Sequence, residues 1–362
     1  MVLRKWMPFF ILLLLSVVFL SACGADNSKP ERTGSWAQIN QTLDRAETWK
    51  KIVSGSEFKL GEQSVKGSWN VPSGKQDYYE VKYGSYPCLD GSTVAVPMAV
   101  EFARQILGLS DEDAQGFVNF NTTHTAYENL IYSRPNSGAI HSTRTFLEEY
   151  HPVDLIIATE PSVEELSIAR DNRVELLMQP VCYDAFVFIT HKDNPVESLT
   201  VQEIQKIYSG EITNWQEVGG SDAKIEPYQR EKNSGSQTAM ENLVMKGIPM
   251  LPPAMTKVAA GMGELVDAVA EYKNAESSLG YTYRYYIDTL YKNENIKVLR
   301  VNGVSSVPEN LRNTAYPFTT SYYGVIRQAD KQNTGGRFLQ WMLSAEGQEC
   351  IEQAGYVPLN EQ

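Results

Sequence analysis

The chain has 362 residues, of which 42% are hydrophobic, and a net charge of −12. This composition is typical of a globular protein, and the length exceeds that of one ordinary hydrophobic core, so we expect two lobes. The acidic balance and the lack of any long lysine or arginine run exclude the usual classes of nucleic-acid-binding protein. An anionic ligand would therefore have to be held by local donors against an unfavourable overall field.

The N-terminus carries the features of a secretory signal peptide. Arg4 and Lys5 supply a positive start, and the apolar run at residues 9–20 contains a single polar residue, Ser16. These twelve residues would extend about 18 Å as a helix, which is too short for a hydrocarbon core of about 30 Å. We therefore predict a cleaved signal peptide over residues 1–22 rather than a membrane span.

The residues from Leu20 to Gly24 (LSACG) resemble a bacterial lipobox. We expect Cys23 to be lipidated and to anchor the mature chain to the membrane, because two acyl chains hold a protein that one chain binds only marginally. The alternative is an ordinary signal peptide in which Cys23 is incidental. Residues 23–76 are expected to form a lipidated tether and an N-terminal extension of unknown purpose.

From about residue 78 onward, strand and helix patterns alternate, which indicates an α/β fold with mostly parallel sheets. Residues 153–158 (VDLIIA) form a short apolar run that is typical of a buried parallel strand. Ser162 and Thr200 each begin a capping box, which predicts the start of a helix. The other expected helices cover residues 99–107, 239–245 and 337–354, and the other expected strands cover residues 185–190 and 322–326.

Two segments combine hydroxyl side chains, a glycine and a helix start: residues 90–93 (DGST) and residues 230–238 (REKNSGSQT). A helix N-terminus favours negative charge, glycine lets the backbone approach a ligand closely, and Arg230 offers a planar fork of donors to an oxyanion. The alternative for either segment alone is that its Ser or Thr merely caps a helix. Neither segment has the glycine spacing of a P-loop, which disfavours a nucleotide. Together they predict an anion clamp between two lobes.

Three stretches resemble the phosphate-binding proteins of high-affinity phosphate ABC importers. The sequence DGSTVAVP at residues 90–97 is similar to the first ligand loop of that family. Residues 194–220 (NPVESLTVQEIQKIYSGEITNWQEVGG) match its most distinctive block, and residues 228–240 (YQREKNSGSQTAM) resemble its Arg-x-x-Gly-Ser-Gly-Thr anion loop. The resemblance covers about residues 80–359, and it implies an α/β, two-lobed type II periplasmic-binding-protein fold with two hinge-crossing strands.

The resemblance also implies where the lobes divide. The crossings are expected near residues 181–189 and 322–326, so that lobe two is the continuous segment 188–318. Lobe one then consists of residues 77–187 plus 319–362. Closure of the two lobes around the anion would be a hinge motion.

Six ligand positions carry over from the family by position. They are Ser92 and Thr93 in lobe one, and Arg230, Ser234, Gly235 and Ser236 in lobe two. The sequence departs from the family at Asn233, where glycine is usual, and at Ser236, where threonine is usual. Because asparagine tolerates a left-handed backbone and Ser236 keeps a hydroxyl, we expect the loop to be intact.

A third part of the family's site corresponds to residues 122–127 (TTHTAY) and 158–161 (ATEP), which would make Thr123 and Thr125 ligands. Glu160 stands where a carboxylate would accept the proton of hydrogen phosphate and thereby exclude fully ionised sulfate. The alternative is that Glu160 is a solvated charge in the first turn of a helix. In the same way, His124 is more simply a helix cap, and the tyrosines at residues 281–286 are more simply core packing.

The resemblance implies an extracytoplasmic solute-binding lipoprotein, anchored to the cell membrane through Cys23, which captures phosphate and delivers it to the permease of an ABC importer. We expect a monomer without cofactor, metal or nucleic acid. The alternatives are a protein of the same fold for another oxyanion or small anionic solute, and a surface sensor or adhesion protein. A phosphate-ester hydrolase, and an enzyme in general, is disfavoured because Gly-x-Ser-x-Gly is absent and no His/Asp set accompanies Ser234.

Overall fold

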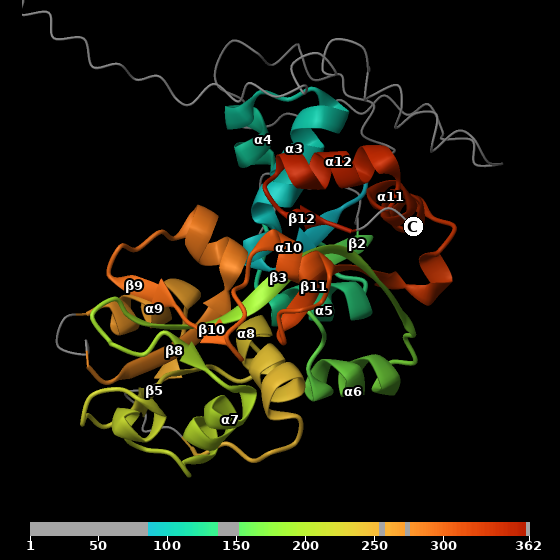
Figure 1. The fold of residues 1–362 in the computed structure, drawn as a ribbon. Helices are drawn as coiled ribbons and strands as arrows, with labels where there is room; N and C mark the ends of the chain where they lie inside the picture. The colour runs from blue at the N-terminus through green and yellow to red at the C-terminus, as the bar shows by residue number, and fades with distance from the viewer. Residues whose placement is uncertain (1–85, 137–151, 253–257, 272–275, 360–362) are drawn as a thin grey trace, which may run out of the picture. The chain divides into compact units, whose positions relative to one another are not determined.

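The computed structural model describes residues 86–136, 152–252, 258–271 and 276–359, which all belong to one compact unit, Asp44–Gln362 (Figure 1). The predicted signal peptide, Cys23 and the tether and extension at residues 23–76 lie outside the described residues. Among the helices of the described ranges, none has the length and hydropathy needed to traverse a bilayer.

The long strand β3 (Leu176–His191) is shared by two sections of one eight-stranded sheet. Its residues 176–185 pair antiparallel with β11 (Thr319–Arg327), and its residues 186–189 pair antiparallel with β8 (Ser278–Tyr283). We call the part of the sheet that contains β11 section one and the part that contains β8 section two. The predicted strands at residues 185–190 and 322–326 are therefore confirmed, and both are longer than expected.

Short strands complete the two sections. Section one also contains β1 (Leu89–Gly91), β2 (Leu155–Ala158) and β12 (Val357–Pro358), and section two also contains β5 (Glu226–Pro227) and β9 (Ile296–Val298). Two small sheets stand apart: β4 (Ser198–Leu199) pairs with β10 (Arg300–Val301), and β6 (Gln229–Arg230) pairs with β7 (Val258–Ala259).

The expectation of mostly parallel sheets is wrong for the centre of the fold. The pairings of β11 with β2, β11 with β3, and β3 with β8 are all antiparallel, whereas the parallel pairs, such as β1 with β2, involve two or three residues of each strand. The two strands run in opposite directions because β3 passes from section one into section two, whereas β11 returns from section two into section one. Apolar runs indicate that a strand is buried but carry no information about its direction.

Helices surround both sections, with α3, α4, α11 and α12 gathered at one end of Figure 1 and α7 at the opposite end. The helices that follow strands of section one are α3 (Val96–Leu107), α4 (Asp111–Phe117), α5 (Thr123–Ile131), α6 (Val163–Asp171), α11 (Thr334–Met342) and α12 (Ala345–Gln353). The others are α7 (Val201–Ser209), α8 (Gly235–Ala239), α9 (Met262–Ala270) and α10 (Pro308–Arg312). The remaining helical segments are the 3-10 helices η3 (Thr93–Ala95), η5 (Trp215–Val218) and η10 (Gln328–Asp330) and the π-helices η6 (Met240–Met245) and η9 (Tyr286–Leu290).

Both predicted capping boxes are confirmed. Ser162 and Thr200 accept the N–H of the third helical residue of α6 and α7, and the glutamate there accepts the N–H of the cap residue in return. The prediction of a single helix at residues 337–354 is wrong, because the helix is interrupted between α11 and α12. There Leu343 is the C-cap of α11, and Ser344 caps α12 by accepting the N–H of Gly347.

Aromatic side chains fill the core where the two sections meet. Phe186 and Phe188 of β3 both pack against Tyr281 of β8, with ring centroids 5.4 and 6.4 Å apart. The parallel strands β1 and β2 have their carboxyl ends at the same edge of section one, and β8 ends at Tyr283 in section two. These strand ends lead directly into the residues of the pocket described next.

Candidate functional site

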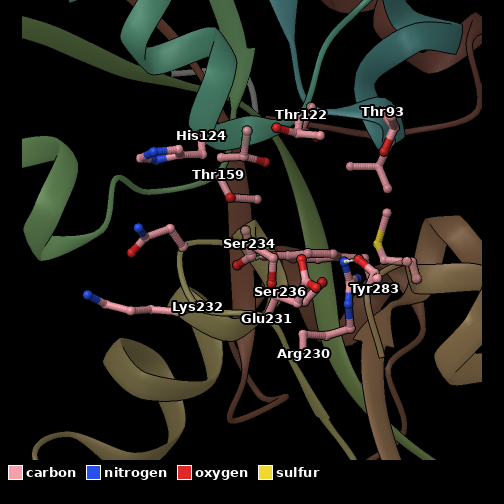
Figure 2. A pocket seen from close by; sticks show the side chains of 18 residues that line it. Thr93, Thr122, His124, Thr159, Arg230, Glu231, Lys232, Ser234, Ser236 and Tyr283 are labelled. Atoms are coloured by element: carbon pink, nitrogen blue, oxygen red, sulfur yellow. Dashed lines mark hydrogen bonds between the residues drawn. The ribbon is translucent and has the colours of Figure 1, made fainter. Parts of the chain in front are cut away.

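A cavity of about 400 Å³ lies between the two sheet sections (Figure 2). Section one contributes loop and helix-start residues, and section two contributes the loop before α8, the start of α9 and the end of β8. The lining residues are Ser92, Thr93, Val94, Thr122, Thr123, His124 and Thr159 on one side, and Arg230 to Ser236, Ala260, Gly261, Met262 and Tyr283 on the other.

Buried Asp90 fixes the loop that carries Ser92. Its carboxylate accepts hydrogen bonds from the N–H of Gly91 at 2.8 Å and from the N–H and side-chain amide of Asn121 at 2.9 and 2.8 Å. The Asn129 amide adds a bond at 3.0 Å. Burial raises the pKa of the Asp90 carboxyl, and these hydrogen bonds oppose the rise. Asp90 therefore acts on the pocket indirectly, by tying the end of β1 to α5.

The loop approaches β2 so closely that only glycine fits at Gly91. A Cβ there would lie 2.2 Å from the carbonyl oxygen of Ile157, so the glycine serves strand packing rather than approach to a ligand, which corrects our expectation. The next residue, Ser92, donates its N–H to the same carbonyl at 3.0 Å. Its side-chain Oγ is buried and has no hydrogen-bond partner among the described residues. A buried hydroxyl without a partner is costly, which suits a position that contacts a ligand.

The start of α5 forms the adjoining wall. Thr122 caps this helix by accepting the N–H of Thr125, and buried Thr123 lines the pocket. Thr125 does not line the pocket, and its Oγ1 lies 3.2 Å from Oγ1 of Thr122. The structure therefore brings Thr123, but not Thr125, to the other predicted residues.

At the end of β2, the pocket-lining residue is Thr159 rather than Glu160. Thr159 is buried, its carbonyl accepts a 2.7 Å bond from the hydroxyl of Tyr127, and its Oγ1 has no hydrogen-bond partner among the described residues. Glu160 is exposed, lies outside the pocket lining and accepts a 3.2 Å hydrogen bond from the hydroxyl of Tyr323. Successive residues of an extended chain point to opposite sides, so the two side chains diverge.

From section two, Arg230 reaches the pocket with its guanidinium held in place. Its Nε donates to the carbonyl of Ala259 at 3.0 Å, and its Nη2 donates to the carbonyl of Ala260 at 2.7 Å. Partial burial lowers the pKa of Arg230, but a guanidinium remains charged at any ordinary pH. The two bonds fix the plane of the guanidinium, so that its charge is presented to the pocket in a fixed orientation.

The loop before α8 brings its backbone across the pocket. Asn233 has a φ of 65°, the left-handed conformation that we expected there, and Ser234 caps α8 by accepting the N–H of Gln237 at 3.2 Å. A Cβ on Gly235 would lie 2.6 Å from Oγ1 of Thr159 and 2.9 Å from Oγ1 of Thr123. Gly235 therefore lets section two touch section one directly.

Two further contacts fix the inner side of this loop. The hydroxyl of Tyr283, at the end of β8, donates to the carbonyl of Gly235 at 3.1 Å. Burial raises the pKa of Tyr283, so its phenol stays protonated and acts as a donor. Ser236, in the first turn of α8, is buried against the same region.

The rim of the pocket carries charged groups from α6. Exposed Glu164 accepts hydrogen bonds from Lys232 Nζ at 3.1 Å and from Asn233 Nδ2 at 2.8 Å. These hydrogen bonds lower the pKa of Glu164, the bond from Asn233 most strongly. Next to it, Nδ1 of His124 lies 2.8 Å from buried Glu165, whose pKa is raised by burial. His124 therefore pairs with α6, and Thr122 rather than His124 caps α5.

The structure thus places seven of the predicted residues around one pocket: Ser92, Thr93, Thr123, Arg230, Ser234, Gly235 and Ser236. Thr125 and Glu160 lie outside it. Sequence reasoning did not assign ligand roles to Thr122, Thr159, His124 or Tyr283, all of which line the pocket. The position of Thr159 at the end of a predicted buried strand was a usable signal. Within the described ranges, no group of three or more metal-ligating side chains is found.

Comparisons with known proteins bear on the family and the fold of the chain. A family model described as a PBP superfamily domain matches residues 126–346. The phosphate-binding protein PstS of Borreliella burgdorferi is 27% identical over 180 residues, which covers 48% of this chain and 63% of that protein. PstS of Bacillus subtilis is 24% identical over 170 residues, which covers 47% of this chain and 53% of that protein. The chain thus spans less than two thirds of the length of these relatives.

Solved structures confirm the expected two-lobed type II periplasmic-binding-protein fold. A substrate-binding protein from Clostridium perfringens, assigned to phosphate ABC transport and solved with bound phosphate, aligns with a TM-score of 0.55 at 24% identity, covering 75% of this chain and 98% of its own. An ABC-type phosphate transport receptor from Vibrio cholerae aligns with a TM-score of 0.52 at 18% identity, covering 74% of this chain and 98% of its own.

Proposed function

The chain belongs to the PBP superfamily, and on that premise we propose that it captures phosphate between its two lobes and delivers it to an ABC importer. The relatives named phosphate-binding proteins support this ligand class. We further propose that Ser92, Thr93, Thr123 and Thr159 bind the ion from lobe one, and that Arg230 and residues 234–236 bind it from lobe two.

The observation that carries the proposal is the convergence of uncompensated polar groups in one cavity. Buried Ser92 and Thr159 present hydroxyls without partners among the described residues and line the same pocket as Arg230. Thr159 and Arg230 lie on opposite sides of it (Figure 2). A tetrahedral oxyanion would accept hydrogen bonds from all three side chains. Lys232 is paired with Glu164, and exposed Glu231 also lines the pocket, so the guanidinium of Arg230 is the local charge that opposes the negative field of a chain with a net charge of −12.

Three further features belong to the same proposal. We place the lobe boundaries at residues 187/188 and 318/319, close to the point where β3 changes its partner from β11 to β8. We propose that the protein acts outside the cytoplasm as a monomer, anchored to the membrane through a lipid on Cys23. We also propose that it is not an enzyme, because Ser234 Oγ is engaged as a helix cap rather than held by a base.

Isothermal titration calorimetry of the purified protein with phosphate tests the proposal. We expect tight one-site binding, and we expect Arg230→Gln to weaken it at least a hundredfold, because the variant removes the fixed charge that faces the ligand. Arg300→Gln, at an exposed arginine outside the pocket, is the matched control and should bind like the wild type. Failure of the wild type to bind phosphate would refute the proposed function.

One observation favours a second candidate, a binding protein for a fully ionised oxyanion such as sulfate. Glu160, which we expected to accept the proton of hydrogen phosphate, is outside the pocket, and the carboxylate that does line it belongs to exposed Glu231. Without a buried acceptor, selection against sulfate has no evident basis. Titration with sulfate under the same conditions separates the two candidates, because tighter binding of sulfate than of phosphate would favour the second.

A further inference from the structure

Part of the proposed phosphate site is apolar. Val94 and Met262 line the pocket together with the ring of Tyr283. Met262 begins α9 just two residues after Ala260, whose carbonyl oxygen accepts the bond from Arg230. Met262 is therefore on the same side of the pocket as the guanidinium that we propose to hold the anion, and Val94 lies on the opposite side.

The two sheet sections already touch each other elsewhere around this cavity. The backbone of Gly235 is packed against the hydroxyls of Thr123 and Thr159, and Glu164 bridges to Lys232 and Asn233 at the rim. The cavity is therefore enclosed in part by direct contacts between the two sheet sections. It is bounded by Thr93 on one side and by Arg230 and Tyr283 on the other (Figure 2).

This remaining space is large for an inorganic ion. The cavity measures about 400 Å³, whereas a water molecule takes about 30 Å³ of liquid and a phosphate ion has only five heavy atoms. Cavities of roughly 300–1,000 Å³ are typical of sites for small organic ligands. Met262 packs partly against the core and also presents apolar surface to the pocket, and an inorganic ion held by Arg230 would offer that surface no carbon to bury.

We propose that this pocket also binds phosphate monoesters, with the phosphate group held by the hydroxyls and Arg230 and the carbon-bearing group packed against Met262 and Val94. This inference rests on the proposed function and widens the substrate class of the same site. It requires a small organic group, because Gly235 and Thr159 close the hydroxyl-lined side of the cavity.

Competition calorimetry with defined probes tests the inference. Inorganic phosphate, methyl phosphate and glycerol 3-phosphate are each titrated into the wild-type protein, and each ester is then titrated into protein saturated with inorganic phosphate. We expect glycerol 3-phosphate to compete for one site with an affinity within about tenfold of that of inorganic phosphate. If inorganic phosphate binds but neither ester competes, the inference is wrong and the proposed function stands. If none of the three binds, the proposed function fails as well.

A substitution at the apolar surface provides a second, independent readout. Met262→Gln keeps the length of the side chain but replaces its apolar end, so we expect the ratio of glycerol 3-phosphate to inorganic phosphate dissociation constants to rise about tenfold. Leu343→Gln changes an exposed leucine at the end of α11, outside the pocket, and should leave the ratio unchanged. An unchanged ratio in Met262→Gln, with ester binding intact, would show that the organic group lies elsewhere and would overturn the assignment.

Discussion

Asp184 is a buried carboxyl at the point where β3 changes partner, and we expect it to make stability depend on pH. Its Oδ1 accepts the N–H groups of Ala185 at 2.7 Å and Tyr285 at 3.2 Å, and its Oδ2 accepts the hydroxyl of Tyr322 at 2.8 Å. Burial raises the pKa of Asp184 from 3.8 to about 7. Because the folded state holds this proton more tightly than the unfolded state, the protein loses stability as pH rises from about 4 to 7.

The magnitude follows from the size of that shift. A difference of about three pKa units corresponds to a loss of at most about 4 kcal/mol of stability. The loss occurs as pH rises from about 4 to 7, and about 2–3 kcal/mol of it falls between pH 5 and pH 8. Asp184→Asn removes the titration, and the hydroxyl of Tyr322 can turn to accept a hydrogen bond from the new amide. We therefore expect the variant to gain stability relative to the wild type by about 2–3 kcal/mol on going from pH 5 to pH 8.

Urea denaturation of both proteins at pH 5 and pH 8 measures this gain. Asp171→Asn, at a side chain that is 68% exposed, is the control and should show the same difference from the wild type at both pH values. If the stability difference between Asp184→Asn and the wild type is the same at pH 5 and pH 8, then Asp184 does not titrate in this range and our explanation is wrong.

Three further substitutions test the pocket itself. Gly235→Ala places a Cβ 2.6 Å from Oγ1 of Thr159, so we expect phosphate affinity to fall at least about tenfold; an unchanged dissociation constant in calorimetry would contradict the close approach. Glu164→Gln weakens the bridge to Lys232, so the dissociation rate of phosphate in stopped-flow experiments should rise about threefold at low salt, and a rate equal to that of the wild type would show that the bridge does not hold the lobes. Ser92→Ala removes a hydroxyl without a protein partner, so the melting temperature without ligand should not fall while phosphate affinity falls about tenfold; the reverse pattern would make this hydroxyl structural.

Much of the site could be predicted because many of its residues belong to short segments of continuous sequence. The capping boxes at Ser162 and Thr200 predict the start of a helix from sequence, because both partners of each box lie within four residues. The carbonyls of Ala259 and Ala260 that fix the guanidinium lie in a distant segment. The presence of a donor fork at Arg230 and of a helix cap at Ser234, both in one loop, nevertheless follows from residue type alone. These inferences need no knowledge of how distant parts of the chain come together.

The errors arise where a result depends on direction or on long-range packing. To choose Thr159 rather than Glu160, one must know which face the end of β2 turns toward the cavity. This depends on pairing with β11, about 165 residues further along the chain. The break at Ser344 depends on Gly347 fitting closely against the carbonyl of Trp341, which no helical pattern reveals. The pairing of His124 with Glu165 likewise joins two helices that the sequence does not show to be neighbours.

The sharing of β3 between the two sheet sections has a consequence for affinity. Residues 176–185 and 186–189 belong to one uninterrupted strand, so the groups on either side of the cavity are connected by backbone rather than by a loose linker. Any relative rotation of Ser92 and Arg230 must therefore occur by bending of this strand where its partner changes from β11 to β8. Because the backbone allows this one bend rather than the free movement of a linker, association orders fewer degrees of freedom, and more of the contact energy remains available as affinity.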